Sequence, residues 1–258
     1  MQFLITRLRL IGVLCAAILM VLRGYLTMRL VFPFRGLEAK QALTQQWARD
    51  LLHLFRVEVE MVGAAPKSGP ILLAANHISW LDILLLLAAA PVRFVARIEN
   101  KHWPILGRMT RQAGAVFVAR QSPRDMARAI DEVSASLANN AAIIAFFPEG
   151  KTSSGMGVEA FHGNLLQAAI AANCPVQAVA LDYRLRATGE RSSAVTYASP
   201  LSLLQSLLNT LAAGPYTAQV RFATPIPSCG QTRKHLAAQL RQQVMVLRGD
   251  IAATSTPI

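Results

Sequence analysis

The sequence has few cysteines, and their placement excludes two classes of protein. Cys15, Cys174 and Cys229 are widely separated and form no CxxC pair, which argues against a disulfide-rich scaffold and against a zinc site. We therefore expect no metal ion, and we interpret the cysteines as free thiols in a reducing compartment. No GxSxG sequence occurs in the chain, which argues against a serine hydrolase.

Acidic residues are also scarce. The chain has 14 of them against 26 lysines and arginines, a formal charge of +12 and a pI of about 10.6. Such an excess favours a polyanionic neighbour, either a membrane surface or a nucleic acid. Charged residues make up only 16% of the chain and hydrophobic residues 53%, more apolar than an average soluble domain. Because no nucleic-acid-binding motif is present, we expect membrane lipids as partners and no nucleic acid.

The longest apolar run lies near the N-terminus. Residues 10–22 are uninterrupted by polar side chains, and Arg7, Arg9 and Arg23 flank them. A helix of that length covers about 20 Å, short of the roughly 30 Å hydrocarbon core, so a span needs the flanking residues too. No small-x-small cleavage site precedes a polar sequence. We predict a retained anchor that crosses once or lies in one leaflet.

The next segment, residues 36–56, has the spacing of an amphipathic helix. Leu43, Trp47, Leu51 and Leu54 follow one another at intervals of three and four, which places them on one helical face. Such a face more often packs on a protein core than lies on a bilayer surface, and both interpretations are open.

From Val57 onward, short apolar runs alternate with helical stretches. The predicted strands comprise the alternating Val57, Val59 and Met61, then residues 71–75, 92–96, 115–119, 142–147, 176–181, 194–198 and 219–222. The predicted helices are residues 80–89, 124–138, 163–172, 201–213 and 232–248. This alternation indicates an α/β fold with a largely parallel central sheet flanked by helices. No repeat or long linker interrupts it, so we predict two parts: a helical membrane-anchoring segment, 1–56, and one domain, 57–258.

The first candidate site is NHISWLD, residues 76–82, directly after a predicted strand. His77 would lie in the strand-to-helix turn, where a neutral imidazole can activate an alcohol near pH 7. Asp82 can reach back to fix the ring tautomer and stabilise the imidazolium. Alternatively, Ser79 and Asp82 form a capping box, S-x-x-D, at the start of a helix. Spacing by itself favours the cap.

The second candidate site is FFPEGKTS, residues 146–153. Gly150 allows backbone N–H groups to approach a ligand, Lys151 adds a cation and Thr152 adds a hydroxyl. A phosphate or a carboxylate fits such a turn, although an ordinary Pro-Glu-Gly turn has the same sequence. Glu149 is unusual beside an anion unless it pairs with a cation or binds a substrate hydroxyl.

The third candidate is Arg120, which ends the predicted strand in GAVFVAR, residues 114–120. Arginine binds phosphate through two parallel hydrogen bonds. A strand-end arginine that simply faces solvent is an equally good interpretation.

Taken in order, these segments resemble the conserved blocks of the glycerolipid acyltransferases, above all the bacterial PlsC-like 1-acyl-glycerol-3-phosphate acyltransferases, a group of lysophospholipid acyltransferases. The blocks are NHxSxxD, GxxFxxR, FPEG and a hydrophobic strand with an internal proline, here residues 174–180. KHWPILG at 101–107 and FHG at 161–163 also resemble family features. The motifs span roughly residues 70–181.

The resemblance implies that His77 deprotonates the free hydroxyl of a lysolipid, that Asp82 orients it, and that Arg120, Glu149 and Gly150 bind the head group. The hydroxyl would attack an acyl thioester of CoA or of acyl carrier protein, with no acyl-enzyme and no cofactor. The implied location is the bacterial inner (cytoplasmic) membrane, with the acyltransferase domain on the cytoplasmic side.

One block departs from the family pattern. The third block usually reads FPEGTRS, whereas Lys151 and Thr152 stand here in place of the threonine and arginine. Lys151 could replace the missing charge only as a point cation from the neighbouring position. This departure weakens the case for lysophosphatidic acid, which stays the first expected acceptor, and it makes a lyso-ornithine lipid the second. The alternative that is not an enzyme is a catalytically idle, basic protein that binds membranes.

Overall fold

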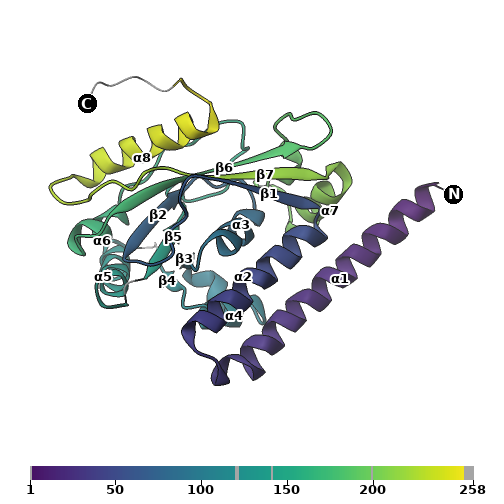
Figure 1. The fold of residues 1–258 in the computed structure, drawn as a ribbon, viewed down its shortest axis with the longest axis horizontal. Helices are drawn as coiled ribbons and strands as arrows, with labels where there is room; N and C mark the ends of the chain where they lie inside the picture. The colour runs from purple at the N-terminus through teal and green to yellow at the C-terminus, as the bar shows by residue number, and fades with distance from the viewer. Residues whose placement is uncertain (1, 120–121, 141, 199, 253–258) are drawn as a thin grey trace.

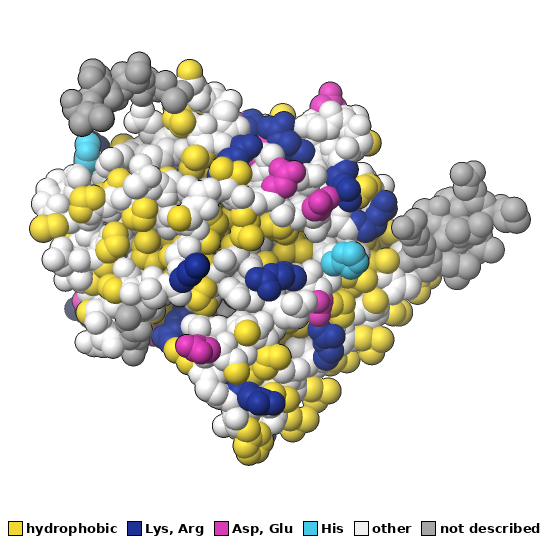
Figure 2. Space-filling view, in the orientation of Figure 1, with side chains coloured by type: hydrophobic (Ala, Val, Ile, Leu, Met, Phe, Trp, Pro, Cys, Tyr) yellow, Lys and Arg dark blue, Asp and Glu magenta, His cyan; other side chains and the backbone are white. Residues whose placement is uncertain are grey.

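The computed structural model describes residues 2–119, 122–140, 142–198 and 200–252 (Figure 1). Its first helix, α1 (Gln2–Leu30), lies alongside the body of the protein and is longer than the predicted apolar run. Helix formers continue through Arg23, whose guanidinium reaches Asp50 of the next helix at 2.5 Å. The stretch Leu10–Leu30 is long and apolar enough to cross a membrane, and hydrophobic side chains gather along its exposed length (Figure 2).

A short 3₁₀ turn, η1 (Phe32–Phe34), leads into α2 (Leu37–Leu54), which confirms the predicted amphipathic helix. One side of α2 contacts α1, where the Trp47 indole Nε1 donates a hydrogen bond to the Met20 carbonyl at 2.9 Å. Gly24 makes this approach possible, because a Cβ there would lie 2.5 Å from Trp47 Nε1. The other side buries Leu51 and Leu52 in the core. The second half of the helix therefore packs on protein on both sides, while Leu37 and Leu43 in its first half are exposed.

The central sheet has seven strands in the order β1-β7-β6-β2-β5-β3-β4. Five of them run parallel: β2 (Ile71–Ala75), β3 (Arg93–Arg97), β4 (Val116–Val118), β5 (Ile143–Phe146) and β6 (Val176–Leu185). The last strand, β7 (Tyr216–Phe222), is antiparallel to β6, and β1 (Val57–Val62) is parallel to β7. The predicted α/β fold with a largely parallel sheet is confirmed.

Helices cover both faces of the sheet (Figure 1). On one face lie α2, α3 (Leu81–Ala89) and α7 (Leu203–Ala213), and on the other α5 (Pro123–Asn140), α6 (Leu166–Ala171) and α8 (Arg233–Arg248). The buried strand β2 contributes side chains to the core on both faces of the sheet, since Leu73 packs on the first face and Leu72 on the second. That strand is hydrophobic throughout because both of its faces are covered.

Two segments differ from the predictions. The predicted strand at 194–198 is wrong, because the chain forms a 3₁₀ turn there, η3 (Ser193–Val195). Its apolar alternation resembles a strand, but β6 already has β2 and β7 as neighbours. The Tyr197 amide instead donates to the Ile78 carbonyl at 3.1 Å. Two short helices, η2 (Ile98–His102) and α4 (Leu106–Gln112), were not predicted, since neither is long enough to show a helical period.

Candidate functional site

The candidate site lies at the carboxyl ends of β2 and β5, where parallel sheets place their ligands. These strands are hydrogen-bonded neighbours, with Ala74 opposite Phe146. The segments that follow them therefore leave the sheet side by side. NHISWLD and FPEG, which are 71 residues apart by their first positions, 76 and 147, meet at this edge.

Asn76 fixes the start of the turn after β2. Its side chain is buried, accepts from the Leu181 amide at 2.8 Å and donates to the Leu181 carbonyl at 3.0 Å. It thus replaces a backbone pair and ties the end of β2 to β6. Without it, two buried backbone groups of β6 would lack partners.

The His77 imidazole contacts the Asp82 carboxylate, with 2.8 Å between Nδ1 and Oδ2. The same Oδ2 accepts from the amides of Ile78 at 2.6 Å and Ser79 at 2.8 Å. One carboxylate thus both accepts from two amides before α3 and contacts the ring. The predicted capping box is formed only in part, because the N-cap of α3 is Trp80, without a side-chain cap, and Ser79 Oγ accepts from the Leu81 amide at 3.3 Å rather than from that of Asp82. A carboxylate only accepts hydrogen bonds, so Nδ1 carries the proton and the lone pair of Nε2 is left for a substrate.

Tyr183 is a member of this cluster that the sequence did not predict. Its hydroxyl donates to Asp82 Oδ1 at 2.6 Å. Burial raises the pKa of Tyr183 well above its usual value, and the nearby Asp82 raises it further, so the hydroxyl remains a donor. The predicted strand ended at residue 181, whereas β6 runs to Leu185. The alternation of Leu181, Tyr183 and Leu185 with polar residues was the available signal.

Phe147 holds the plane of the imidazole. Its ring stacks on His77 with centroids 3.8 Å apart and 10° between the planes, and it also stacks against Phe94 at 6.1 Å. Together with Asp82, this stacking restricts rotation of the His77 ring. No sequence pattern indicated this stacking.

Glu149 contacts the same histidine through the backbone. Its Oε1 accepts from the His77 amide at 3.0 Å, and only 4% of the residue is exposed. Its Oε2 is buried with no hydrogen-bond partner among the described residues. Burial raises the pKa of Glu149 to about 7, against the opposing effect of the His77 amide. Burial therefore favours the neutral form of this carboxyl relative to that of an exposed glutamate.

The rest of the FPEG segment forms a tight turn. Gly150 has a φ of +76°, and its amide donates to the Phe147 carbonyl at 3.1 Å, a conformation that favours glycine. Lys151 is exposed, while the Thr152 hydroxyl donates to the Tyr197 carbonyl and is thus engaged with protein.

Ser153, the last residue of the motif, lies against the histidine. Its amide and its hydroxyl both donate to the His77 carbonyl, at 2.7 and 3.0 Å. The structure thus brings His77, Asp82 and Glu149 into direct contact and places 150–153 beside them. Arg120 lies outside the described residues.

The comparison with known proteins matches these segments. The sequence model of the acyltransferase family matches residues 56–182. A lyso-ornithine lipid O-acyltransferase of Pseudomonas aeruginosa is 35% identical over 218 residues, which cover 84% of this chain and 83% of that protein. A 1-acyl-sn-glycerol-3-phosphate acyltransferase of Neisseria meningitidis serogroup B is 38% identical over 162 residues, covering 62% of this chain and 63% of its own.

A solved structure shares the fold. The crystal structure of PlsC from Thermotoga maritima, a 1-acyl-sn-glycerophosphate acyltransferase, superposes with a TM-score of 0.70 at 20% identity, covering 99% of this chain and 100% of that one. At this identity the likeness concerns the fold. The sequence matches and the shared fold together identify the chain as an acyltransferase of the PlsC-like glycerolipid acyltransferase family.

Proposed function

We propose that this acyltransferase moves a fatty acyl group from a thioester, acyl-CoA or acyl carrier protein, to the free hydroxyl of a lysolipid. The first candidate acceptor is 1-acyl-glycerol-3-phosphate, which would give phosphatidic acid. The observation that carries the proposal is the 2.8 Å contact between His77 Nδ1 and a fully buried Asp82. That contact leaves Nε2 as the base, on a side chain that is still 16% exposed.

The chemistry follows from this pair. Nε2 of His77 takes the hydroxyl proton as the lysolipid oxygen bonds to the thioester carbonyl carbon. The carbon–sulfur bond then breaks, and the imidazolium returns its proton to the thiolate. Asp82 stabilises the imidazolium while it exists. General base catalysis of this kind contributes roughly 10²- to 10⁴-fold, and the rest depends on alignment of the hydroxyl with the thioester.

Glu149 has a role in binding the acceptor. Its Oε2 is buried and unpartnered among the described residues, and its pKa near 7 keeps much of the carboxyl neutral. A neutral carboxyl donates a hydrogen bond, so Glu149 suits an anionic head group that would repel a carboxylate. Gly150, the exposed cation of Lys151, and Arg120 would complete the head-group site. Thr152 would lie beside them, with its hydroxyl proton already donated to the Tyr197 carbonyl.

A lyso-ornithine lipid is the second candidate acceptor, and one contact favours it. Thr152 stands where the family pattern usually has arginine, and its hydroxyl already donates to Tyr197. The phosphate contact expected from that arginine is therefore absent at residue 152. The relative from Pseudomonas aeruginosa, which matches across 84% of this chain, carries that activity in its name.

The apolar helix α1 supports association with a membrane, where a lysolipid resides. We propose that Leu10–Leu30 holds the enzyme on the bacterial inner membrane with residues 57–258 as the acyltransferase domain on the cytoplasmic side. That placement gives the domain access to acyl-CoA and to acyl carrier protein. The boundary at residue 56 stays a prediction.

Thiol release tests the proposal. The purified protein in mixed detergent–lipid micelles is offered a long-chain acyl-CoA or acyl carrier protein, with lysophosphatidic acid or lyso-ornithine lipid in separate reactions. We expect His77→Ala to lower turnover at least 10²-fold while the protein stays folded. His235→Ala, an exposed histidine on α8, serves as the matched control. Equal rates for His77→Ala and wild type would refute the mechanism. If wild type released no thiol with either acceptor, the result would favour a catalytically idle membrane-binding protein.

A further inference from the structure

The segment between β5 and α6 determines where the backbone of His77 lies. We define residues 149–163 as the site loop, which contains no helix or strand. Glu149 accepts from the His77 amide, and Ser153 donates twice to the His77 carbonyl. Both backbone groups of the candidate base are therefore bound by this loop, and a shift of the loop would move the base.

The middle of the site loop is held by the last helix rather than by the sheet. Arg248, at the end of α8, donates from Nη2 to the Gly155 carbonyl at 2.5 Å and from Nη1 to the Gly157 carbonyl at 3.1 Å. One guanidinium thus spans two loop carbonyls, a geometry that lysine cannot reproduce. Gly155 in turn packs against Ile78, the residue after the base.

Arg241 continues this arrangement one step further along the loop. It donates from Nη2 to the Val158 carbonyl at 2.6 Å and from Nε to the Glu159 carbonyl at 2.8 Å. Arg241 and Arg248 are seven residues apart, about two helical turns, so they lie on the same side of α8. Four loop carbonyls are bound by two arginines of one helix.

Arg248 is buried, so the unfavourable burial of its charge has to be offset by ion pairs and hydrogen bonds. Its side chain has no exposed surface, and its counter-charges lie at 3.3 Å in Asp250 and at 3.9 Å in Asp182. A buried cation is unfavourable unless it is paired and hydrogen-bonded, and an apolar side chain would pack at lower cost. At this position an arginine adds these ion pairs and also the two hydrogen bonds to the site loop.

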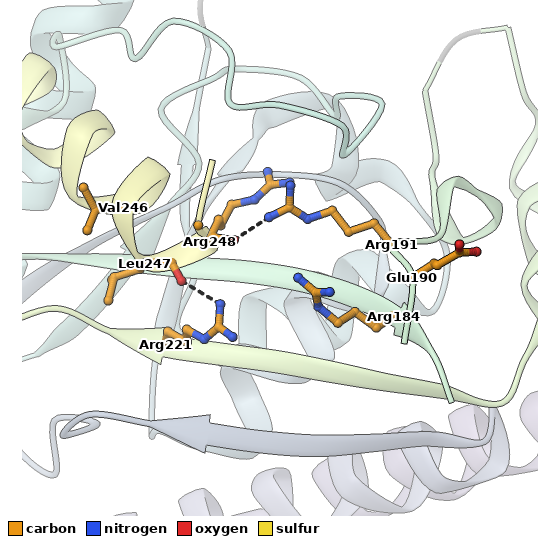
Figure 3. A pocket seen from close by; sticks show the side chains of 8 residues that line it. Arg184, Glu190, Arg191, Arg221, Val246, Leu247 and Arg248 are labelled. Atoms are coloured by element: carbon orange, nitrogen blue, oxygen red, sulfur yellow. Dashed lines mark hydrogen bonds between the residues drawn. The ribbon is translucent and has the colours of Figure 1, made fainter. Parts of the chain in front are cut away.

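The end of α8 is itself fixed to the sheet (Figure 3). Arg191 donates to the Arg248 carbonyl, and Arg221 of β7 donates to the Leu247 carbonyl at 2.6 Å. Arg191 also pairs with Asp182 of β6 at 3.0 Å. The open cavity of about 670 Å³ here is lined by residues 184, 190, 191, 221 and 246–249. None of them is a predicted site residue, so we assign no substrate to it.

We propose that α8 is a positioning element of the active site, in which Arg241 and Arg248 hold the site loop and thereby the backbone of His77. The expected effect on turnover rests on the proposed function, whereas the contacts themselves do not. The physical contact path from α8 through the loop to His77 does not depend on the identity of the substrate. A small displacement of a base from its substrate lowers turnover by up to about 10²-fold.

Arg241→Ala is the main test, because this half-buried arginine can be removed with less effect on folding than Arg248. We expect faster hydrogen–deuterium exchange at residues 153–162 and at the amides of residues 77–79. We expect kcat to fall by roughly 10-fold to 100-fold, with KM for the acyl donor and the lysolipid within about twofold of wild type. Arg241→Lys should recover part of both effects, since it restores the charge and one donor.

Two further variants complete the test. Lys234→Ala removes the same charge from an exposed position on α8 and should match wild type in exchange and kcat. Arg248→Met, which keeps an unbranched side chain, should exceed Arg241→Ala in both effects if it folds. Unchanged exchange at 77–79 in Arg241→Ala, or faster exchange with wild-type kcat, would overturn the proposal.

If wild type shows no turnover with any acceptor, the proposed function fails, but the inference about α8 can still be tested. Exchange at residues 77–79 then decides the inference by itself. Faster exchange there in Arg241→Ala, with Lys234→Ala unchanged, supports the contact path from α8 to His77. Wild-type exchange in both variants rejects it.

Discussion

Replacement of Glu149 by glutamine should make the enzyme more stable at alkaline pH relative to wild type. The side chain is buried beside His77, and Oε2 has no partner among the described residues. Glutamine keeps an oxygen that can accept from the His77 amide, but it does not titrate. The comparison therefore isolates the free energy of ionising a buried carboxyl.

The size and sign of this difference in stability follow from the pKa of Glu149, which burial raises from 4.5 to about 7. Below pH 4.5 the folded and unfolded states both hold the proton. Between pH 4.5 and 7 only the unfolded state loses it, so the stability of wild type falls as pH rises, and above pH 7 the loss is complete. At about 1.4 kcal/mol per pKa unit, the full loss is about 3 kcal/mol, of which about 2–3 kcal/mol develops between pH 5 and pH 8.

The measurement is the free energy of unfolding of both proteins in detergent, by denaturant titration at pH 5, 6, 7 and 8. We expect the advantage of Glu149→Gln over wild type to grow across this series. Any constant effect of the amide cancels in the trend. A difference that stays level from pH 5 to pH 8 would refute the claim that Glu149 is held neutral by burial, and with it the proposed neutral contact to the head group.

Two other predictions concern groups that hold the candidate base. Tyr183→Phe removes the donor to Asp82 Oδ1 and leaves a buried carboxylate oxygen unsatisfied, so we expect the free energy of unfolding to fall by about 1–3 kcal/mol and kcat to decrease; unfolding and steady-state rates of this variant at wild-type level would contradict the role of the contact. Phe147→Leu keeps an apolar side chain but removes the stacked ring at 3.8 Å from His77, so we expect kcat to fall roughly 10-fold with little change in melting temperature. Thiol release and thermal unfolding measured on the same preparation separate these effects, and a drop in stability with unchanged kcat would show that Phe147 serves packing only.

Local patterns predicted most of the elements, because hydrophobic periodicity records which side of a segment is buried. Strand β2 is apolar at every position since both faces are covered, and α2 shows its three-and-four spacing since one face meets the core. The segment at 194–198 has the same local pattern as a strand but finds no free edge next to β6. A local signal contains no information about which edges are already occupied.

The family motifs also predicted His77, Asp82 and Glu149 as site residues, since these residues occur at fixed spacings. The roles of their neighbours depended on the tertiary structure. The carboxylate of Asp82 contacts His77 and also accepts from the Ser79 amide, two contacts between which spacing left the choice open. The contact of Tyr183 with Asp82 joins residues 101 positions apart.

Helix α8 illustrates the same division between sequence and tertiary structure. Its helical period predicted where it lies along the chain, but that period contains no information about what its arginines contact. Only the packing of α8 beside the site loop brings Arg241 and Arg248 to carbonyls 83 and 93 residues away, at 158 and 155. The sequence by itself determined most of the elements and predicted the candidate site residues, because those signals depend on neighbours a few residues away. The tertiary structure decided which distant groups contact those side chains, because such hydrogen bonds depend on which strands and helices lie next to one another in space.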